Sequence, residues 1–399
     1  MGFSSGRLTA LDEHLQKNYI ENQRYSGVLT GIFRKGELVH ASPIGLRDIE
    51  NKKPVRRDTI FRIYSMSKPI TSVALMTLYE RGLFQLDDPV SEYIPQFKNL
   101  EVFDSGVYGE FETTRVNREM TVRDLLSHQS GLTYGFVNRT NVDRAYRDAG
   151  VGEIRTTGNL QKMIDCLSEI PLEFSPGERW NYSVSTDVCG YLVEVISGKP
   201  FDVFLDEVIF QPLGMVDTGF YVKESEKERL AALYQYNEAG LPVLVSDFDA
   251  GDYTRKPSFL SGGGGLVSTL DDYMAFCQMI LGNGKYNDEM ILGRKTLDLM
   301  GSNHLSNGVD LEQVAFGRWS ETQYRGVGFG LGFSVLLDPA ASQVSGSKGE
   351  FAWGGAASTA FWIDKSEDLA VVFLTQLLPS SSYNVRRELR TLVYSAIED

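Results

Sequence analysis

The feature that most restricts the fold is the placement of strand-like segments at both ends of this 399-residue chain, with helical and loop patterns between them. Each segment is a short run enriched in β-branched and aromatic residues and bounded by turn residues. The candidate strands are residues 26–33, 37–43, 59–64, 328–337, 350–363 and 368–377. Because strands from both ends bury their apolar faces best in one shared sheet, the pattern predicts an α/β (α+β) fold with an antiparallel sheet flanked by helices.

This arrangement predicts a discontinuous α/β domain made of residues 1–90 and 255–399, which would contain the sheet. Residues 91–254 carry short helical patterns and few strand signals, so they are predicted to form a mostly helical lobe inserted into that domain. Thr121, with Asp124 three residues later, is typical of a capped helix start within this lobe. The active site is expected in the cleft between the two parts.

The charge and cysteine content limit the partners and the setting of the protein. With 39 basic and 53 acidic residues the net charge is −14, which argues against nucleic acid and anionic membrane surfaces as ligands. No apolar run approaches the length of a membrane-spanning helix. The first residues lack a basic segment followed by an apolar one, and the three cysteines are widely spaced, so we expect a cytoplasmic protein without disulfides. A monomer and a homodimer both fit the sequence.

A Ser-x-x-Lys pattern stands at Ser65 and Lys68, where a strand-like run gives way to a helix-like run. Pro69 is tolerated only in a first helical turn, so Ser65 is predicted at the helix N-terminus with Lys68 one turn further on. Residues three apart share a helix face, which lets the hydroxyl and the amine meet and activates the serine as a nucleophile. A second copy at residues 345–348 lies in a Gly/Ser-rich stretch without a helical pattern and is interpreted as a turn.

Histidine is the usual base for a serine nucleophile, but none of the histidines lies in a Gly-x-Ser-x-Gly context. The four histidines are His14, His40, His128 and His304. Only His128 lies in a motif-like stretch, and we favour a structural role for it. No residue spacing indicates a metal site, and no cofactor is expected. The glycine run at 261–265 lacks the ending of a phosphate-binding loop, so it is interpreted as a close backbone approach before a helix at 269–281.

Three short motifs follow one another along the chain: Ser65-x-x-Lys68, Tyr182-Ser183-Val184 and Trp353-Gly354-Gly355. In this order they resemble the three motifs of serine β-lactamases and penicillin-recognising DD-peptidases. Within that superfamily the pattern is most similar to the family VIII carboxylesterases, which resemble class C β-lactamases but act on esters. Further similar stretches are residues 125–132, 174–182, 212–215 and 263–270. The resemblance therefore covers nearly the whole chain, and its fold matches the inserted-lobe layout.

The resemblance implies a role for each matching residue. Ser65 would be the nucleophile, and Lys68, neutral because it is desolvated, would share the base function with Tyr182. Tyr182 would also pass a proton to the leaving alcohol and activate water for deacylation. The backbone N–H groups of Ser65 and Ala356 would form the oxyanion hole.

Four further positions are predicted to bind substrate: Val184, Trp353, Gly354 and Gly355. The two glycines let their strand approach the substrate closely. Val184 replaces the Asn that ends the second motif in β-lactamases, and Trp353 replaces the cation that begins their third. An indole cannot pair with a carboxylate but offers apolar area, so Trp353 is predicted to line the cleft, with packing in the core as the alternative. Both replacements favour neutral esters over anionic substrates with an amide bond.

The sequence therefore predicts a serine carboxylesterase that hydrolyses short-chain neutral esters through an acyl-serine intermediate. The expected partner is a small-molecule ester. The alternatives with the same Ser-Lys-Tyr site are a β-lactamase, a DD-peptidase, a small-amide hydrolase and an acyltransferase. A binding protein without catalysis is a third hypothesis, against which the retention of Ser65, Lys68 and Tyr182 argues.

Overall fold

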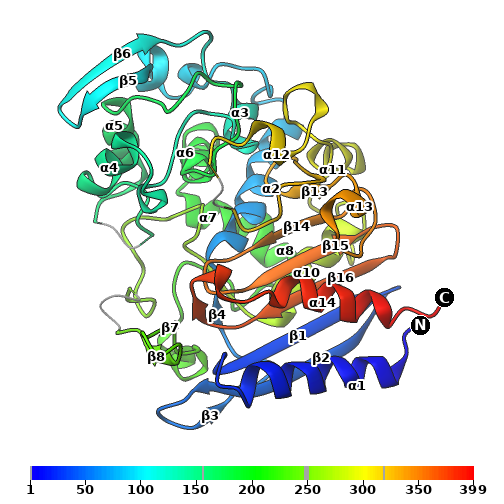
Figure 1. The fold of residues 1–399 in the computed structure, drawn as a ribbon. Coiled ribbons are helices and arrows are strands. Elements are labelled where there is room, and N and C mark those ends of the chain that lie inside the picture. Colours follow the sequence, from blue (N-terminus) through cyan, green and yellow to red (C-terminus); the bar gives the residue numbers. More distant parts are fainter. Residues whose placement is uncertain (1, 155–156, 247–250, 318–319) are drawn as a thin grey trace.

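The main element of the computed structural model is an eight-stranded antiparallel sheet that combines strands from the two ends of the chain (Figure 1). The structure describes residues 2–154, 157–246, 251–317 and 320–399. In spatial order the strands are β12 (Val327–Phe329), β13 (Ser334–Leu336), β14 (Phe351–Gly354), β15 (Ala360–Asp364), β16 (Leu369–Leu374), β1 (Gly27–Arg34), β2 (Glu37–Asp48) and β3 (Lys53–Pro54). β1 pairs with β16, with Leu29 opposite Leu374, which confirms the predicted sheet.

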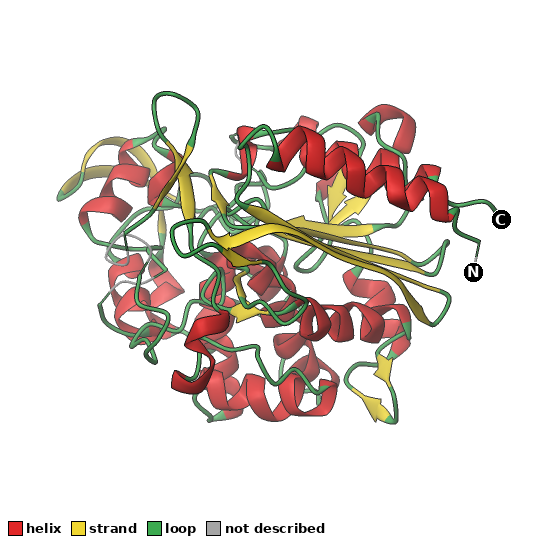
Figure 2. Cartoon of the chain, turned by 90° about the horizontal axis from the view of Figure 1, so that it is seen from below, coloured by secondary structure: helices red, strands yellow, loops and turns green. Residues whose placement is uncertain are grey.

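Helices cover both faces of this sheet, as the view from below shows (Figure 2). On one face, α1 (Ser5–Leu15), continued by a π-helical turn (Gln16–Ile20), packs with α14 (Val385–Ser395). On the other face, α10 (Leu270–Leu281) packs against β16 and β1. Every residue of β16 is buried, as expected for a strand that is covered on both sides. The two chain ends lie side by side at one edge of the molecule (Figure 1).

The helix that follows Ser65 lies in the core of the molecule. α2 (Ser67–Glu80) is buried at all residues from 67 to 78 and packs against α6 (Ser185–Ser197). A helix that is buried on all sides owes its stability to tertiary packing, so its position is tightly fixed. The other described helices are α3 (Val122–Leu126), α4 (Asn141–Asp148), α5 (Leu160–Ser168), α7 (Phe201–Leu205), α8 (Gln211–Leu213), α11 (Arg294–Met300), α12 (Leu311–Val314) and α13 (Pro339–Ser342). Within the described residues, none of the helices has the length and apolar character to cross a bilayer.

Three of the predicted strands differ from the structure. Residues 59–64 give only the short β4 (Phe61–Arg62), which pairs with β9 (Val267–Ser268) outside the large sheet, because the chain turns at once into the segment of Ser65. Residues 328–337 and 350–363 each contain two strands joined by a turn, where one strand was predicted. Both turns lie within runs of small and apolar residues, so the sequence pattern showed no clear break between the paired strands.

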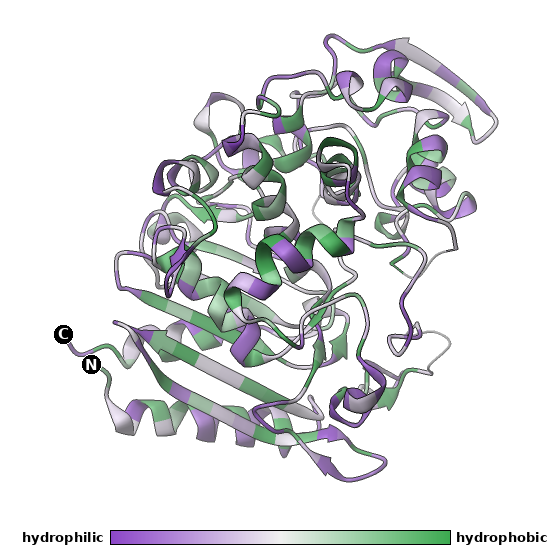
Figure 3. Ribbon diagram, turned by 180° about the vertical axis from the view of Figure 1, so that it is seen from behind, coloured by the Kyte–Doolittle hydropathy of each residue, from purple (hydrophilic) through white to green (hydrophobic). Residues whose placement is uncertain are grey.

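The middle of the chain contains strands that the sequence did not suggest. β5 (Glu101–Val107) and β6 (Glu110–Arg115) form an outlying hairpin that is mostly exposed and hydrophilic (Figure 3), so it lacks the apolar signal of a core strand. Other short strands are β7 (Tyr234–Tyr236) and β8 (Pro242–Leu244) in this middle part, and β10 (Lys285–Tyr286), β11 (Glu289–Met290) and β17 (Leu377–Leu378) in the C-terminal part. β7 pairs in parallel with β17, which ties the end of the middle segment to the C-terminal part of the chain.

Candidate active site

A strained turn presents the predicted nucleophile. Tyr64–Met66 form a 3₁₀ turn that leads directly into α2, with Pro69 in the first turn of the helix as the sequence predicted. Tyr64 has a φ of +44°, a conformation that residues other than glycine rarely adopt and that is often found at functional sites. The turn leaves Ser65 only 8% exposed and turned toward a cavity that it helps to line.

Lys68 lies one turn beyond Ser65 and is buried. Its Nζ is 3.4 Å from Ser65 Oγ, 3.0 Å from the Tyr134 hydroxyl and 2.7 Å from the Gly263 carbonyl oxygen. Burial lowers the pKa of Lys68 to about 7, against the opposing effect of the Asp187 charge. A lysine with this pKa is partly neutral near neutral pH and can accept the proton of Ser65.

Tyr182 approaches the same hydroxyl from the other side. Its OH donates a hydrogen bond to Ser65 Oγ at 2.5 Å, and its ring centroid lies 4.5 Å from Lys68 Nζ. Burial raises the pKa of Tyr182 well above its usual value, and the charge of Glu321 adds to this effect. The phenol is therefore neutral at ordinary pH, and it is placed to give a proton to a group that leaves from Ser65. The structure thus brings the three predicted residues Ser65, Lys68 and Tyr182 together.

Two buried residues that the sequence did not single out complete the surroundings of the lysine. Asp187, in the first turn of α6, accepts hydrogen bonds from the Ser261 hydroxyl at 2.6 Å and the Gly263 N–H at 3.0 Å. These bonds hold the glycine run so that the Gly263 carbonyl faces Lys68. A Cβ at position 263 would lie 2.6 Å from Asp187 Oδ2, which confirms the predicted close backbone approach.

The other unpredicted residue is Tyr134, whose hydroxyl receives a hydrogen bond from Lys68 Nζ and whose ring lies 5.3 Å from that of Tyr182. Burial raises the pKa of Tyr134 well above its usual value, so it stays a neutral partner of the amine. Tyr134 lies just after the stretch 125–132, and Asp187 five residues after Tyr182. A search for polar residues next to the recognised motifs could have found both.

The predicted oxyanion-hole groups lie at this site. Ser65 and Ala356 line the same cavity. Among the described residues, no protein group accepts a hydrogen bond from the backbone N–H of Ser65 or of Ala356. Ala356 follows β14 in the turn that leads to β15. A Cβ at Gly355 would lie 2.4 Å from the Ile63 carbonyl oxygen, so a glycine there lets the turn approach the nucleophile segment. Both N–H groups are therefore available to a ligand oxygen.

The predicted substrate contacts of Trp353, Gly354 and Val184 need correction. Trp353 is 2% exposed and packs with its ring 5.4 Å from Tyr182 and 5.3 Å from Phe329, outside the described lining of the Ser65 cavity. Val184 is fully buried and precedes α6, and a Cβ at Gly354 would meet the Arg386 side chain. Trp353 therefore packs in the core against Tyr182, which is the core-packing alternative.

His128 takes no direct part in this arrangement. Its Nδ1 is 3.1 Å from the Ser183 hydroxyl, and its ring packs against Tyr182 at 5.2 Å and Phe329 at 5.4 Å. Burial lowers the pKa of His128 well below its usual value, so the ring stays neutral. These contacts agree with the structural role favoured from the sequence. Among the described residues no group of three His, Cys, Asp or Glu side chains is arranged to bind a metal.

The cavity in front of Ser65 has a volume of about 820 Å³. Its lining residues are Tyr64, Ser65, Tyr134, Gly135, Phe136, Arg147, Val151, Gly152, Glu153, Ile154, Gly251, Tyr253, Ser261, Gly263, Ala356, Leu378 and Pro379. Apolar and aromatic side chains prevail among them, and they come from both parts of the predicted division of the chain. Such a cavity, with a few polar groups at one end, is typical of a site for a small molecule.

Comparison with known proteins shows the family to which the chain belongs. The family profile described as Beta-lactamase matches residues 12–395, which is nearly the whole chain. The chain belongs to the beta-lactamase family. This membership confirms both the resemblance drawn from the three motifs and the expected fold.

Three relatives show which members of the beta-lactamase family this chain is similar to. Protein Rv1367c of Mycobacterium tuberculosis is 35% identical over 360 residues, which cover 90% of this chain and 87% of that protein. Esterase EstB of Burkholderia gladioli is 30% identical over 372 residues, with 89% and 87% covered. The solved structure of EstCE1, described as a hydrolase with promiscuous acyltransferase activity, superimposes with a TM-score of 0.83 at 28% identity and covers 98% of this chain and 99% of its own.

These relatives, together with the family, identify the protein as a serine hydrolase or acyltransferase with the β-lactamase fold, similar to family VIII esterases.

Proposed function

We propose that the protein is a carboxylesterase that hydrolyses short-chain, neutral carboxylic esters through an acyl-Ser65 intermediate. The observation that carries the proposal is the meeting of a buried lysine amine and a tyrosine hydroxyl on one serine oxygen. The esterase name of EstB, at 30% identity over most of both chains, supports the same reaction class.

In the proposed acylation, Ser65 Oγ attacks the ester carbonyl carbon while neutral Lys68 accepts the hydroxyl proton. The carbonyl oxygen becomes an oxyanion and accepts hydrogen bonds from the N–H groups of Ser65 and Ala356. As the carbon–oxygen bond to the alcohol breaks, the Tyr182 hydroxyl protonates the leaving oxygen and recovers a proton from Lys68. Deacylation reverses these proton movements, with water in the place of the alcohol, and releases the carboxylic acid.

The preference for neutral esters rests on the surroundings of Ser65. Phe136, Val151, Ile154 and Leu378 offer apolar contact area, worth about 0.8 kcal/mol per buried CH₂ group of a substrate. Where β-lactamases begin their third motif with a cation, this chain has the buried Trp353, which offers a carboxylate no counter-ion. A penicillin carboxylate would therefore find no counter-ion at the third-motif position, although Arg147 is a cation of the cavity lining, whereas a short acyl chain would gain by contact.

Acyl transfer to an alcohol is the second candidate function. A cavity of about 820 Å³ leaves room beside a short acyl group for an acceptor larger than water. The description of EstCE1 as a hydrolase with promiscuous acyltransferase activity supports this possibility for the same site. Added alcohol would then divide the acyl-enzyme between acid and new ester.

The test is a series of p-nitrophenyl esters of increasing acyl length, compared with a chromogenic cephalosporin and with Ser65→Ala as the control. We expect the acetyl to hexanoyl esters to have the highest kcat/KM and the cephalosporin to be turned over poorly. Mass spectrometry of the protein after treatment with a serine-directed phosphonate should find the adduct on Ser65. Activity that survives in Ser65→Ala, or a preference for the cephalosporin, would contradict the proposal.

A further inference from the structure

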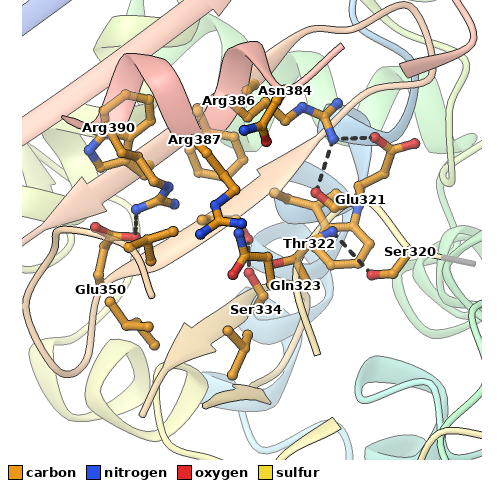
Figure 4. Close-up of a pocket in the computed structure, with 18 of the residues that line it drawn as sticks. Ser320, Glu321, Thr322, Gln323, Ser334, Glu350, Asn384, Arg386, Arg387 and Arg390 are labelled. Carbon is orange, nitrogen blue, oxygen red and sulfur yellow. Dashed lines mark hydrogen bonds and ion pairs between the residues drawn. The ribbon is translucent and has the colours of Figure 1, made fainter. Parts of the chain in front are cut away.

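A second cavity, of about 290 Å³, is lined by strands β13 to β15, residues 320–323 and the start of α14 (Figure 4). Trp353, which contacts Tyr182, is part of its lining, so the cavity adjoins the catalytic centre. Two ion pairs reach it from α14, and Figure 4 draws both as dashed lines. They are Arg386 with Glu321 and, one helical turn further, Arg390 with Glu350. Both carboxylates are buried, with side-chain exposures of 0% and 1%.

The Arg386 guanidinium also binds the backbone of the oxyanion-hole turn. Its Nη2 donates hydrogen bonds to the carbonyl oxygens of Gly355 at 3.0 Å and Thr359 at 2.7 Å. Its Nη1 donates to the Glu321 carbonyl oxygen at 3.0 Å and lies 2.6 Å from Glu321 Oε2. Gly355 and Thr359 are the two ends of the turn that carries Ala356, so one planar group holds both ends of that turn.

Within the turn, the Gly355 N–H donates to the Thr359 carbonyl at 3.0 Å and the Ser358 N–H donates to the Gly355 carbonyl at 3.0 Å. Ser358 has a φ of +68°, an unfavourable conformation for a residue with a side chain, which must be held by its surroundings. A Cβ at Gly354 would lie 2.4 Å from Arg386 Cζ, so the glycine of the third motif makes room for the guanidinium against the strand.

We propose that Arg386 is a positioning residue for the oxyanion hole: it holds the 355–359 turn so that the Ala356 N–H faces the ester carbonyl at Ser65. The inference rests on the proposed acyl-Ser65 mechanism. A guanidinium has five coplanar N–H donors, and that of Arg386 contacts three carbonyl oxygens and a carboxylate, whereas an ammonium has only three N–H donors. Glu321 fixes the guanidinium in turn, since its buried carboxylate has this cation as its ion-pair partner.

Arg390 provides a matched control on the same helix. It also pairs with a buried glutamate, and it lies over the Trp362 ring at 4.9 Å. Its described contacts do not include the 355–359 turn. Removing either ion pair therefore removes a similar interaction from the same wall of the cavity, but only the Arg386 pair reaches the turn that carries Ala356.

The experiment compares two charge-neutral double variants, Arg386→Met/Glu321→Gln and Arg390→Met/Glu350→Gln, with p-nitrophenyl butyrate as substrate. Neither leaves an unpaired buried charge. Because the charge of Glu321 influences the pKa of Lys68, kcat is compared on the high-pH plateau of each variant. We expect the first variant to lose about 10²-fold in kcat with little change in KM, as a misplaced oxyanion donor would cause, and the second to stay within about threefold of wild type. Arg386→Lys, which keeps the charge, should lie between wild type and the double variant.

A second measurement does not depend on turnover. Hydrogen exchange, followed by mass spectrometry of a peptide that covers residues 355–359, should become faster in the Arg386 variants and stay unchanged in the Arg390 variant. Equal kcat losses in both double variants, or unchanged exchange in the Arg386 variants, would overturn the inference. If wild type does not hydrolyse the ester, the proposed function fails, while the exchange comparison still decides whether Arg386 holds the turn.

Discussion

The pKa of Lys68 gives a quantitative expectation for the pH dependence of the reaction. Burial lowers it to about 7, and only the neutral amine can accept the Ser65 proton. At pH 6 about 9% of the amine is neutral and at pH 8 about 91%, so kcat/KM should rise about tenfold between these two values. Above pH 8 the rate should level off, because the pKa of Tyr182 is raised far above this range.

The variant Asp187→Asn tests the origin of this profile. The amide can still accept the hydrogen bonds from Ser261 and Gly263, so the position of the Gly263 carbonyl is preserved. The Asp187 charge raises the pKa of Lys68, so its removal should move the rising part of the profile to lower pH. The variant would then retain a larger share of its plateau rate under acidic conditions than wild type does.

The assay is initial-rate hydrolysis of an acetate or butyrate ester in a pH-stat, which avoids the pH-dependent absorbance of nitrophenol. The quantity compared is kcat/KM, because it reports the ionisation of the free enzyme. A rate that does not change between pH 6 and pH 8, or a shift of the Asp187→Asn profile to higher pH, would refute the assignment of Lys68 as the base.

Four further changes have defined outcomes. Tyr182→Phe should lower kcat by about 10²-fold or more, whereas His128→Asn should lower it by less than about tenfold, as steady-state kinetics would show. Trp353→Ala should lower the free energy of unfolding by about 3–5 kcal/mol in urea denaturation, because it empties a buried site behind Tyr182; a loss below about 1 kcal/mol would contradict the core placement. The unfolded chain, with a lysine pKa of 10.5, binds more protons than the folded one above about pH 7, so stability relative to Lys68→Met should rise with pH by up to about 1.4 kcal/mol per unit. A flat difference between pH 7 and 10 would show that Lys68 is charged in the folded protein.

The sequence was a good guide where local chemistry decides the structure. The position of Pro69 restricts it to a first helical turn, which placed Ser65 and Lys68 correctly. The Thr121–Asp124 capping box forms as predicted, because both of its hydrogen bonds are made within four residues. Gly198 ends α6 with a φ of 71°, as a glycine after a helical pattern commonly does.

The sequence failed where the decisive contact joins distant segments. Trp353 was assigned to the cleft from its place in the third motif, and it is buried instead; a strand pattern gives two faces but not which of them meets the core. Asp187 and Tyr134 belong to the site only because α6, the glycine run and α2 pack together. The role of Gly354 could not be inferred without Arg386, which lies 32 positions later in the chain.

The pairing of β1 with β16 has a consequence for synthesis on the ribosome. β1 is complete at Arg34 and pairs on one side with β2, but its partner on the other side, β16, begins only at Leu369. Until then one side of this apolar strand remains an open edge, which is prone to join strands of other chains. The nascent protein therefore has to shield this edge until β16 has been made, and a chain that stops before Leu369 is expected to aggregate even though its nucleophile, lysine and tyrosine are all present.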